Sequence, residues 1–143
     1  SDRAGGARVT PSVRRGLRTL PAVLWAALIW WLSSTPDDGA SWLALPWLDL
    51  PGLDKIAHAG LFGVLAALMR LAGATPVAAV AGAFAWGVVD EVHQAFVPGR
   101  TPDVADVAAD VTGAVVAVLA VRWLASRRAV ARYADRPERR SEP

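Results

Sequence analysis

Residues 90–114 read DEVHQAFVPGRTPDVADVAADVTGA, and this stretch decides how the chain folds. Polar residues close one apolar segment, the turn VPGRTP follows at residues 97–102, and Asp103 begins the next apolar segment. Proline and glycine in so short a connection end one helix and allow another to start. The stretch therefore predicts two helices joined by a tight turn, with ionisable side chains on both sides of that turn.

Further apolar segments lie on either side of this turn. Working outward, helices are expected at residues 76–96 and 103–124, then at 54–73, and finally at 17–32. Hydrophobic residues make up 54% of the chain, whereas about 45–50% is usual in soluble domains, and a helix that crosses a bilayer needs about 20 apolar residues. The sequence predicts an all-α, integral membrane four-helix bundle. A soluble bundle with buried helices is the less favoured alternative.

The domain organisation follows from these segments. A basic N-terminal tail is expected at residues 1–16, a four-helix membrane domain at 17–124 and a basic C-terminal tail at 125–143. A cleavable signal peptide is the competing interpretation of the first apolar segment, but Trp30 and Trp31 are poor neighbours for a small-residue cleavage site. The first segment is therefore interpreted as a membrane span.

Basic residues are distributed unevenly about the four predicted spans. Thirteen of the 15 Lys and Arg residues fall on the side that holds both tails, and only Lys55 and Arg100 fall on the other side. The positive-inside rule then predicts a multi-pass protein of the cell membrane with both termini cytoplasmic. The loop at residues 33–53, with Trp42 and Trp47 as interfacial aromatic side chains, is expected outside.

Polar side chains gather at the outer ends of the second, third and fourth segments: Asp54, Lys55, His58, Asp90, Glu91, His93, Gln94, Asp103, Asp106 and Asp110. A helix turns by about 100° per residue, so Asp103, Asp106 and Asp110 share one stripe, and Glu91 shares a face with Gln94. Asp54 and His58 share a face by the same spacing. Charged groups within a membrane are costly unless they are paired or hydrated. These side chains are therefore expected to point inward, with Lys55 and Arg100 as partners of the carboxylates.

Two interpretations of this constellation remain open. The structural one makes Asp54 and Asp103 helix N-caps and the other carboxylates members of ion pairs. The functional one is a water-accessible pocket in which Arg100 and Lys55 hold an anionic group while a neighbouring side chain exchanges protons or holds a cation. The predicted ligand-binding residues are Lys55, Arg100, Gln94, Asp54, Asp103 and Asp110. The catalytic candidates are Glu91, Asp106 and His58, with enzyme activity itself left open.

No cofactor and no metal ligand is predicted. A divalent metal could be held by His58 and several carboxylates, but no tight motif such as HExxH is present. The chain also has no cysteine, which excludes a thiolate site. His93 is interpreted as an interfacial side chain rather than a ligand. Small residues are expected to let the helices pack closely, namely Gly60, Gly63, Gly82, Gly87 and Gly113.

Three motifs in combination resemble the VanZ-like family of small membrane proteins. They are DKIAHAGLFGVL at residues 54–65, the stretch at 90–114 quoted above, and SSTP at 33–36. The matching positions are Asp54, Lys55, His58, Glu91, Gln94, Pro98, Gly99, Arg100, Asp103, Asp106 and Gly113. Asp110 stands where the family often has asparagine, which adds a potential charge. The founding member of the family is associated with resistance to the glycopeptide teicoplanin, so the resemblance implies a role in the cell envelope.

The resemblance and the constellation together favour a protein that binds an anionic lipid or envelope precursor at the outer leaflet and affects glycopeptide susceptibility. One alternative is a membrane enzyme acting on a lipid-linked phosphate or glycan, with Arg100 holding the phosphate and Glu91 or Asp106 as general base. Another is a small proton-coupled carrier. Membrane lipids are the expected partners and nucleic acid is not, because positive-inside topology already accounts for the arginines. Assembly of several copies is left open.

Overall fold

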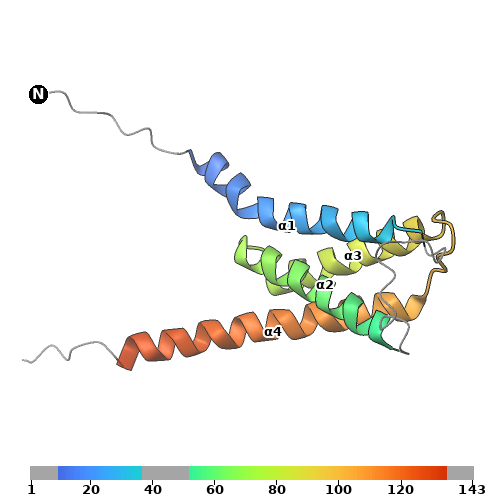
Figure 1. Ribbon diagram of the computed structural model, residues 1–143. Helices are drawn as coiled ribbons and strands as arrows, with labels where there is room; N and C mark the ends of the chain where they lie inside the picture. The colour runs from blue at the N-terminus through green and yellow to red at the C-terminus, as the bar shows by residue number, and fades with distance from the viewer. Residues whose placement is uncertain (1–9, 37–51, 135–143) are drawn as a thin grey trace, which may run out of the picture.

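The computed structural model describes residues 10–36 and 52–134, and within them all regular secondary structure is α-helical (Figure 1). The four helices are α1 (Pro11–Ser33), α2 (Leu53–Leu71), α3 (Pro76–Gln94) and α4 (Val104–Ala134). The prediction of an all-α chain with four helices is confirmed for these residues. The loop carrying Trp42 and Trp47 lies outside the described residues.

Two of the helices are longer than the sequence predicted. α1 begins at Pro11, where proline suits the first turn of a helix because that turn needs no N–H donor. Pro21 lies inside α1, and Figure 1 shows a bend in the N-terminal part of this helix, as expected where proline removes a backbone hydrogen bond. α4 continues to Ala134 because no glycine or proline interrupts residues 125–134. The first ten residues of the predicted C-terminal tail are therefore helical.

The ends of the helices are fixed by local signals. Thr75 caps α3 by accepting a hydrogen bond of 3.1 Å from the Ala78 backbone N–H. Asp103 accepts a bond of 2.8 Å from the Ala105 N–H at the start of α4, as the structural interpretation of Asp103 predicted. Asp54 is not an N-cap, because α2 is capped by Gly52 and Asp54 lies within its first turn. There its negative charge is favourable next to the helix N-terminus.

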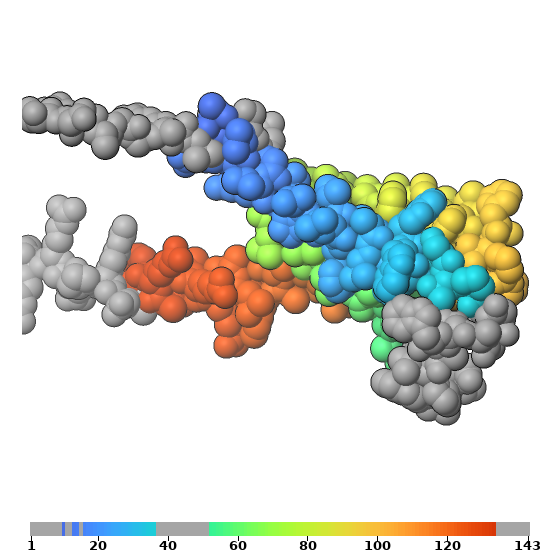
Figure 2. All heavy atoms as spheres, turned by 45° about the horizontal axis from the view of Figure 1, so that its top comes forward, coloured from blue at the N-terminus to red at the C-terminus, as the bar shows by residue number. Residues whose placement is uncertain are grey.

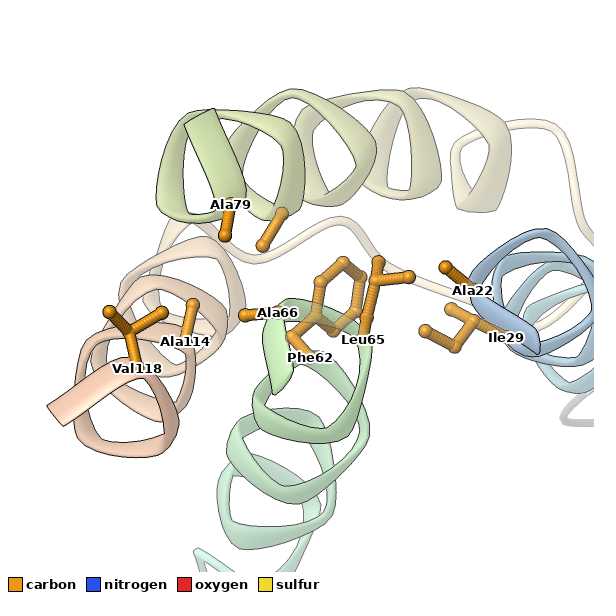
Figure 3. Close-up of a cluster of buried hydrophobic side chains, with 9 residues drawn as sticks. Ala22, Ile29, Phe62, Leu65, Ala66, Ala79, Ala114 and Val118 are labelled. Carbon is orange, nitrogen blue, oxygen red and sulfur yellow. The ribbon is translucent and has the colours of Figure 1, made fainter. Parts of the chain in front are cut away.

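The core lies around α2, which contacts all three of the other helices. Figure 3 shows Phe62, Leu65 and Ala66 of α2 between α1 on one side and α4 on the other, with α3 above them. The remaining members of this core are small or branched side chains: Ala22, Ile29, Ala79, Ala83, Ala114 and Val118. Within the described residues, α1 makes no contact with α4. So many alanines allow the helix backbones to approach closely.

The closest approach of α2 to α4 involves glycine on both sides. A Cβ atom on Gly113 would lie 1.9 Å from the Ala59 carbonyl oxygen, and one on Gly63 would lie 3.0 Å from the Gly113 carbonyl oxygen. The predicted packing role is confirmed for these two residues. It is wrong for Gly60, where an added Cβ would meet no atom within 4 Å.

Large apolar side chains cover much of the outside of the bundle. They include Leu24, Trp31, Val77, Phe84, Val88, Val116, Leu119 and Trp123, all exposed. Two helices, over residues 16–33 in α1 and 104–133 in α4, are long and apolar enough to cross a membrane by length and composition. α2 and α3 have 19 residues each, or about 29 Å, and charged side chains occupy part of that length. Figure 2 shows the C-terminal part of α4 projecting well beyond the body of the bundle.

The chain direction brings four helix ends together. The C-terminal ends of α1 and α3 and the N-terminal ends of α2 and α4 lie at the same end of the bundle (Figure 1). At the opposite end, the start of α1 and the end of α4 diverge in both Figure 1 and Figure 2. The polar residues of the sequence motifs all lie near the first of these ends.

Candidate functional site: a polar cluster at one end of the bundle

Six side chains from α2, α3, α4 and the residue before α4 form what is here called the polar cluster: Lys55, His58, Glu91, Asp103, Asp106 and Asp110. Lys55 lies at its outer edge. Its Nζ donates to Asp103 Oδ2 and Asp106 Oδ1, both at 2.7 Å, and to Asp54 Oδ2 at 3.3 Å. The prediction that Lys55 partners the carboxylates is confirmed. These contacts also bind the start of α2 to the start of α4.

His58 lies one helical turn deeper, between two carboxylates of α4. Its Nδ1 is 3.0 Å from Asp110 Oδ1, and its Nε2 is 4.0 Å from Asp106 Oδ2. The stripe of Asp103, Asp106 and Asp110 predicted from helical spacing therefore faces α2, as expected. The Asp110 carboxylate is fully buried.

Gly87 of α3 makes room for this carboxylate. A Cβ atom at residue 87 would lie 2.5 Å from Asp110 Oδ2. Gly87 was predicted as a site of helix packing, and its contact is with a functional-site side chain instead. Any larger residue there would push Asp110 out of its position beside His58.

Glu91 enters the polar cluster from α3 and is held by one of its two oxygens. Glu91 Oε2 accepts a hydrogen bond of 2.7 Å from the Asp103 backbone N–H. Glu91 Oε1 is buried and has no hydrogen-bond partner among the described residues, although the residue is only 7% exposed. A buried carboxylate oxygen without a partner is costly, so this atom needs a separate explanation.

A second polar network lies beside the polar cluster and joins α1 to α3. Asp90, 1% exposed, accepts hydrogen bonds through Oδ2 from Ser33 Oγ at 2.7 Å and from Gln94 Nε2 at 3.1 Å. Gln94 thus lies near the predicted site but bonds to Asp90 rather than to a member of the polar cluster. The sequence analysis placed Asp90 among the polar residues at the end of the third segment but assigned it no role. Its partner Ser33 is the first residue of the SSTP motif, so that motif was the signal that could have pointed to this contact.

His93 belongs to this second network as well. Its Nε2 lies 2.9 Å from Ser34 Oγ, and its ring stacks on Trp30 with centroids 3.8 Å apart. These contacts are with α1 and not with the carboxylates of the polar cluster. The interpretation of His93 as a side chain outside the ligand set agrees with this geometry.

Arg100 lies in the turn between α3 and α4 and is exposed. Its Nε donates to the Thr35 carbonyl oxygen at 3.2 Å. Within the described part of the chain, no carboxylate forms a salt bridge with its guanidinium, so the predicted pairing of Arg100 with the cluster carboxylates is not found there. A guanidinium held by a carbonyl keeps donors for an external acceptor.

The charges of the polar cluster do not balance by ordinary pairing. Four carboxylates, those of Glu91, Asp103, Asp106 and Asp110, are set against one ammonium, that of Lys55. The hydrogen bond from Lys55, followed by the one from the Ala105 N–H, lowers the pKa of the Asp103 carboxyl below its usual value, so Asp103 is ionised at neutral pH. One ligand atom from each of His58, Glu91 and Asp106 lies within 4.8 Å of the others, an arrangement of the kind that metal ions use.

The catalytic roles suggested for Glu91, Asp106 and His58 stay predictions, as does the ligand-binding role of the other candidates. The structure brings all three catalytic candidates into one group and places Asp54 at its exposed edge. Gln94 and Arg100 lie next to this group, and each bonds elsewhere. The site at this end is therefore acidic, with one lysine inside it and one arginine beside it.

Comparison with known families agrees with the motifs that build this site. No curated protein and no solved structure shows significant similarity to the chain. The family described as VanZ/LLP1 matches residues 17–125, which covers most of the chain and includes every member of the polar cluster. The chain thus belongs to the VanZ/LLP1 family.

Proposed function

We propose that this protein spans the membrane with four helices and binds the anionic headgroup of a lipid or lipid-linked envelope precursor at the outer face, with Arg100 as the anion contact. Through that ligand it affects susceptibility to teicoplanin-type glycopeptides. The observation that carries the proposal is an exposed arginine without a carboxylate partner in the described chain, next to an acidic cluster and beside apolar helix faces.

The distribution of side chains supports the membrane setting. Among the described residues, six polar or charged ones are buried, including Asp90, Glu91 and Asp110, while many large apolar residues are exposed on the helices. This is the reverse of the pattern in a soluble bundle. Ionisable residues within membrane helices usually point to the bundle interior and pair with one another, as the residues of the polar cluster do.

The positions of the basic residues support the proposed orientation. α1 carries Arg14 and Arg18 near its start, and the last turns of α4 carry Arg127, Arg128 and Arg132. These residues lie at the end of the bundle opposite the polar cluster. By the positive-inside rule that end faces the cytoplasm, which would put the polar cluster and Arg100 at the outer face.

The contacts of the two basic side chains favour Arg100 over Lys55 as the anion contact. Lys55 already has three carboxylates within 3.3 Å, so its charge is used inside the site. Within residues 10–36 and 52–134, Arg100 bonds only a backbone carbonyl, through Nε. Its planar fork of donors suits a phosphate or carboxylate group. The family's founding member is associated with resistance to teicoplanin, which implies a role in the cell envelope, and an outer-leaflet ligand of this chemistry fits that role.

Native mass spectrometry of protein gently extracted from its host membrane tests the proposal. Wild type should retain a defined phosphate-bearing lipid that Arg100→Ala loses. Arg122→Ala is the matched control, because Arg122 is an exposed arginine on α4 towards the other end of the bundle. Glycopeptide susceptibility of cells that express each variant should follow lipid retention. Identical bulk lipids on all three proteins would contradict the proposed anion contact.

A membrane enzyme acting on a lipid-linked phosphate is the second candidate. The pairing of His58 Nδ1 with Asp110 at 3.0 Å favours it, because a carboxylate on Nδ1 fixes the tautomer in which Nε2 accepts protons. Incubation of the purified protein with a polyprenyl phosphate should then release inorganic phosphate, and His58→Gln should abolish the release. Absence of any turnover by wild type would leave the binding function as the better account.

A further inference from the structure

We propose that His58, Glu91 and Asp106 form a binding site for one divalent transition-metal ion, Zn²⁺ or Mn²⁺. The site uses one residue from each of α2, α3 and α4. It does not depend on the anion proposed for Arg100, since a metal could bind whether or not a lipid does. It also departs from the sequence analysis, which named no metal ligand because no short motif was present.

A neighbouring group orients each of the three proposed ligands. In every case one atom of the side chain is held by a partner and a second atom remains. His58 Nδ1 is held by Asp110, Glu91 Oε2 by the Asp103 N–H, and Asp106 Oδ1 by Lys55. The remaining atoms are His58 Nε2, Glu91 Oε1 and Asp106 Oδ2.

The contacts of His58 are of the kind found in the outer shell of metal sites. A histidine ligand commonly donates its other ring N–H to a carboxylate, which fixes the tautomer and turns the free nitrogen towards the metal. Asp110 is in position to accept such a hydrogen bond from His58. In that role Asp110 is a positioning residue and not a ligand.

Glu91 has a buried oxygen without a partner among the described residues. The residue is 7% exposed, and its Oε1 has no hydrogen-bond partner within the described chain. A cation bonded to this oxygen would remove the cost of burying it. The same cation would offset the excess of carboxylates over ammonium groups in the polar cluster. Protons on His58, which lies between Asp106 and Asp110, and on the carboxylates are the competing account of that excess, and the experiment below decides between them.

The ligand atoms lie close enough together to share one ion. One atom from each of the three residues lies within 4.8 Å of the others, and His58 Nε2 is 4.0 Å from Asp106 Oδ2. Ligand atoms in the tetrahedral arrangement that Zn²⁺ prefers, with bonds of about 2.0–2.2 Å, lie about 3.4 Å apart. Metal binding therefore requires the three ligand atoms to draw together by up to about 1.4 Å, a movement that rotation of the side-chain torsions supplies.

The ligand set selects the class of metal. One imidazole nitrogen with two carboxylate oxygens suits Zn²⁺, Fe²⁺ or Mn²⁺ better than Ca²⁺ or Mg²⁺, which prefer oxygen alone. Among divalent ions the order of affinity places Zn²⁺ above Mn²⁺. Three protein ligands also leave coordination positions open, as in metal sites that bind a further ligand.

Titration of the full chain in detergent micelles, after chelation and removal of the chelator, tests the site. Isothermal calorimetry with ZnCl₂ should give one ion bound per chain, and MgCl₂ should compete only weakly. Outer-shell changes cost about 10–100-fold in metal affinity, so Asp110→Asn should weaken binding by that amount and Glu91→Gln by about 100-fold or more. Glutamine keeps the shape of Glu91 and an oxygen for the Asp103 N–H.

Asp90→Asn is the matched control. It makes the same chemical change at the neighbouring residue of α3, removes a buried charge, and leaves the proposed ligands in place. Zn²⁺ affinity should be unchanged in this variant. If Asp90→Asn and Glu91→Gln weakened Zn²⁺ binding equally, the loss would come from the total negative charge in this region and not from a bond to Glu91, and the proposed site would be overturned. Wild type that binds no stoichiometric Zn²⁺ or Mn²⁺ would overturn it as well.

A second measurement needs no variant that could fail to fold. Electron spin-echo spectroscopy of Mn²⁺ bound to wild type should show coupling to a histidine nitrogen, and absence of that coupling would overturn the assignment of His58. Lipid retention by Arg100→Ala is read separately. Loss of lipid with Zn²⁺ binding intact supports both proposals, whereas retained lipid with Zn²⁺ binding intact removes only the proposed anion contact.

Discussion

Replacement of Gly113 by alanine tests how closely α2 and α4 must approach to assemble the site. A Cβ atom at residue 113 would lie 1.9 Å from the Ala59 carbonyl oxygen, 2.6 Å from its carbonyl carbon and 2.7 Å from its Cα. All three atoms belong to the α2 backbone, so no side-chain rotation relieves the overlap. To restore an ordinary contact of 3.4 Å, the two helices would have to separate by about 1.5 Å at this crossing.

The expected cost follows from two opposing effects. An extra methyl group in a tightly packed contact costs about 1–3 kcal/mol, and the upper end applies because both sides of the contact are helix backbone. Alanine is better than glycine in a helix by about 1 kcal/mol. We therefore expect Gly113→Ala to lower the free energy of unfolding by about 2 kcal/mol. Because Asp110 lies three residues before Gly113 on α4, the separation should also lengthen its contact with His58.

Reversible unfolding in mixed micelles, by titration with dodecyl sulfate and detection by tryptophan fluorescence, measures this cost. Gly60→Ala is the matched control, since Gly60 follows Ala59 in α2 and an added Cβ there meets nothing within 4 Å. That variant should be as stable as wild type or more stable, by up to about 1 kcal/mol. If Gly113→Ala proved as stable as Gly60→Ala, the close packing of α2 on α4 would be refuted.

Two further substitutions probe the polar residues around this crossing. Gly87→Ala should displace the Asp110 carboxylate, because its Oδ2 lies 2.5 Å from the added Cβ, and His58 should lose this partner. NMR of the His58 ring should then show loss of the hydrogen bond at Nδ1. An unchanged spectrum would contradict the contact between residue 87 and Asp110. Ser33→Ala removes a bond of 2.7 Å to the buried Asp90 and should lower the free energy of unfolding by about 1.5–3 kcal/mol, as for other hydrogen bonds to charged groups. The same micelle titration measures that loss, and wild-type stability would show that Asp90 does not rely on α1.

Much of the fold could be predicted because each helix carries its own signals. The helix predicted from residue 76 begins at Pro76 as expected, and the structure shows Thr75 as its cap. The start of α1 and the end of α4 were misplaced because the prediction followed hydropathy. α1 begins at Pro11 and runs through Gly16, and α4 continues through polar residues that include no glycine or proline. Arg127 and Arg128 are helical for that reason. The membrane setting and orientation stay predictions, supported by two apolar helices and the exposed apolar faces.

The candidate site could be predicted only in part. Helical spacing placed Asp103, Asp106 and Asp110 on one face, and the structure shows that face turned towards Lys55 and His58. Spacing within a helix says nothing about which residues of another helix lie opposite, so Ser33 could not be assigned as a partner of Asp90. The bond between Asp90 and Gln94 lies within α3 at a spacing of four residues, so helical periodicity was the signal that could have found it. The pairing expected for Arg100 failed for the same reason, since the turn that carries it directs Nε to the Thr35 carbonyl.

By itself, the sequence determined that four helices form, roughly where they lie, and that their polar residues gather at one depth, because these features depend on local periodicity and composition. Only the tertiary structure decided that His58, Glu91 and Asp106 come within 4.8 Å of one another, because that distance depends on how three helices pack. The packing in turn rests on Gly63 and Gly113, where the absence of a side chain lets α2 and α4 approach. The close contact of two backbones therefore fixes the chemistry of the site.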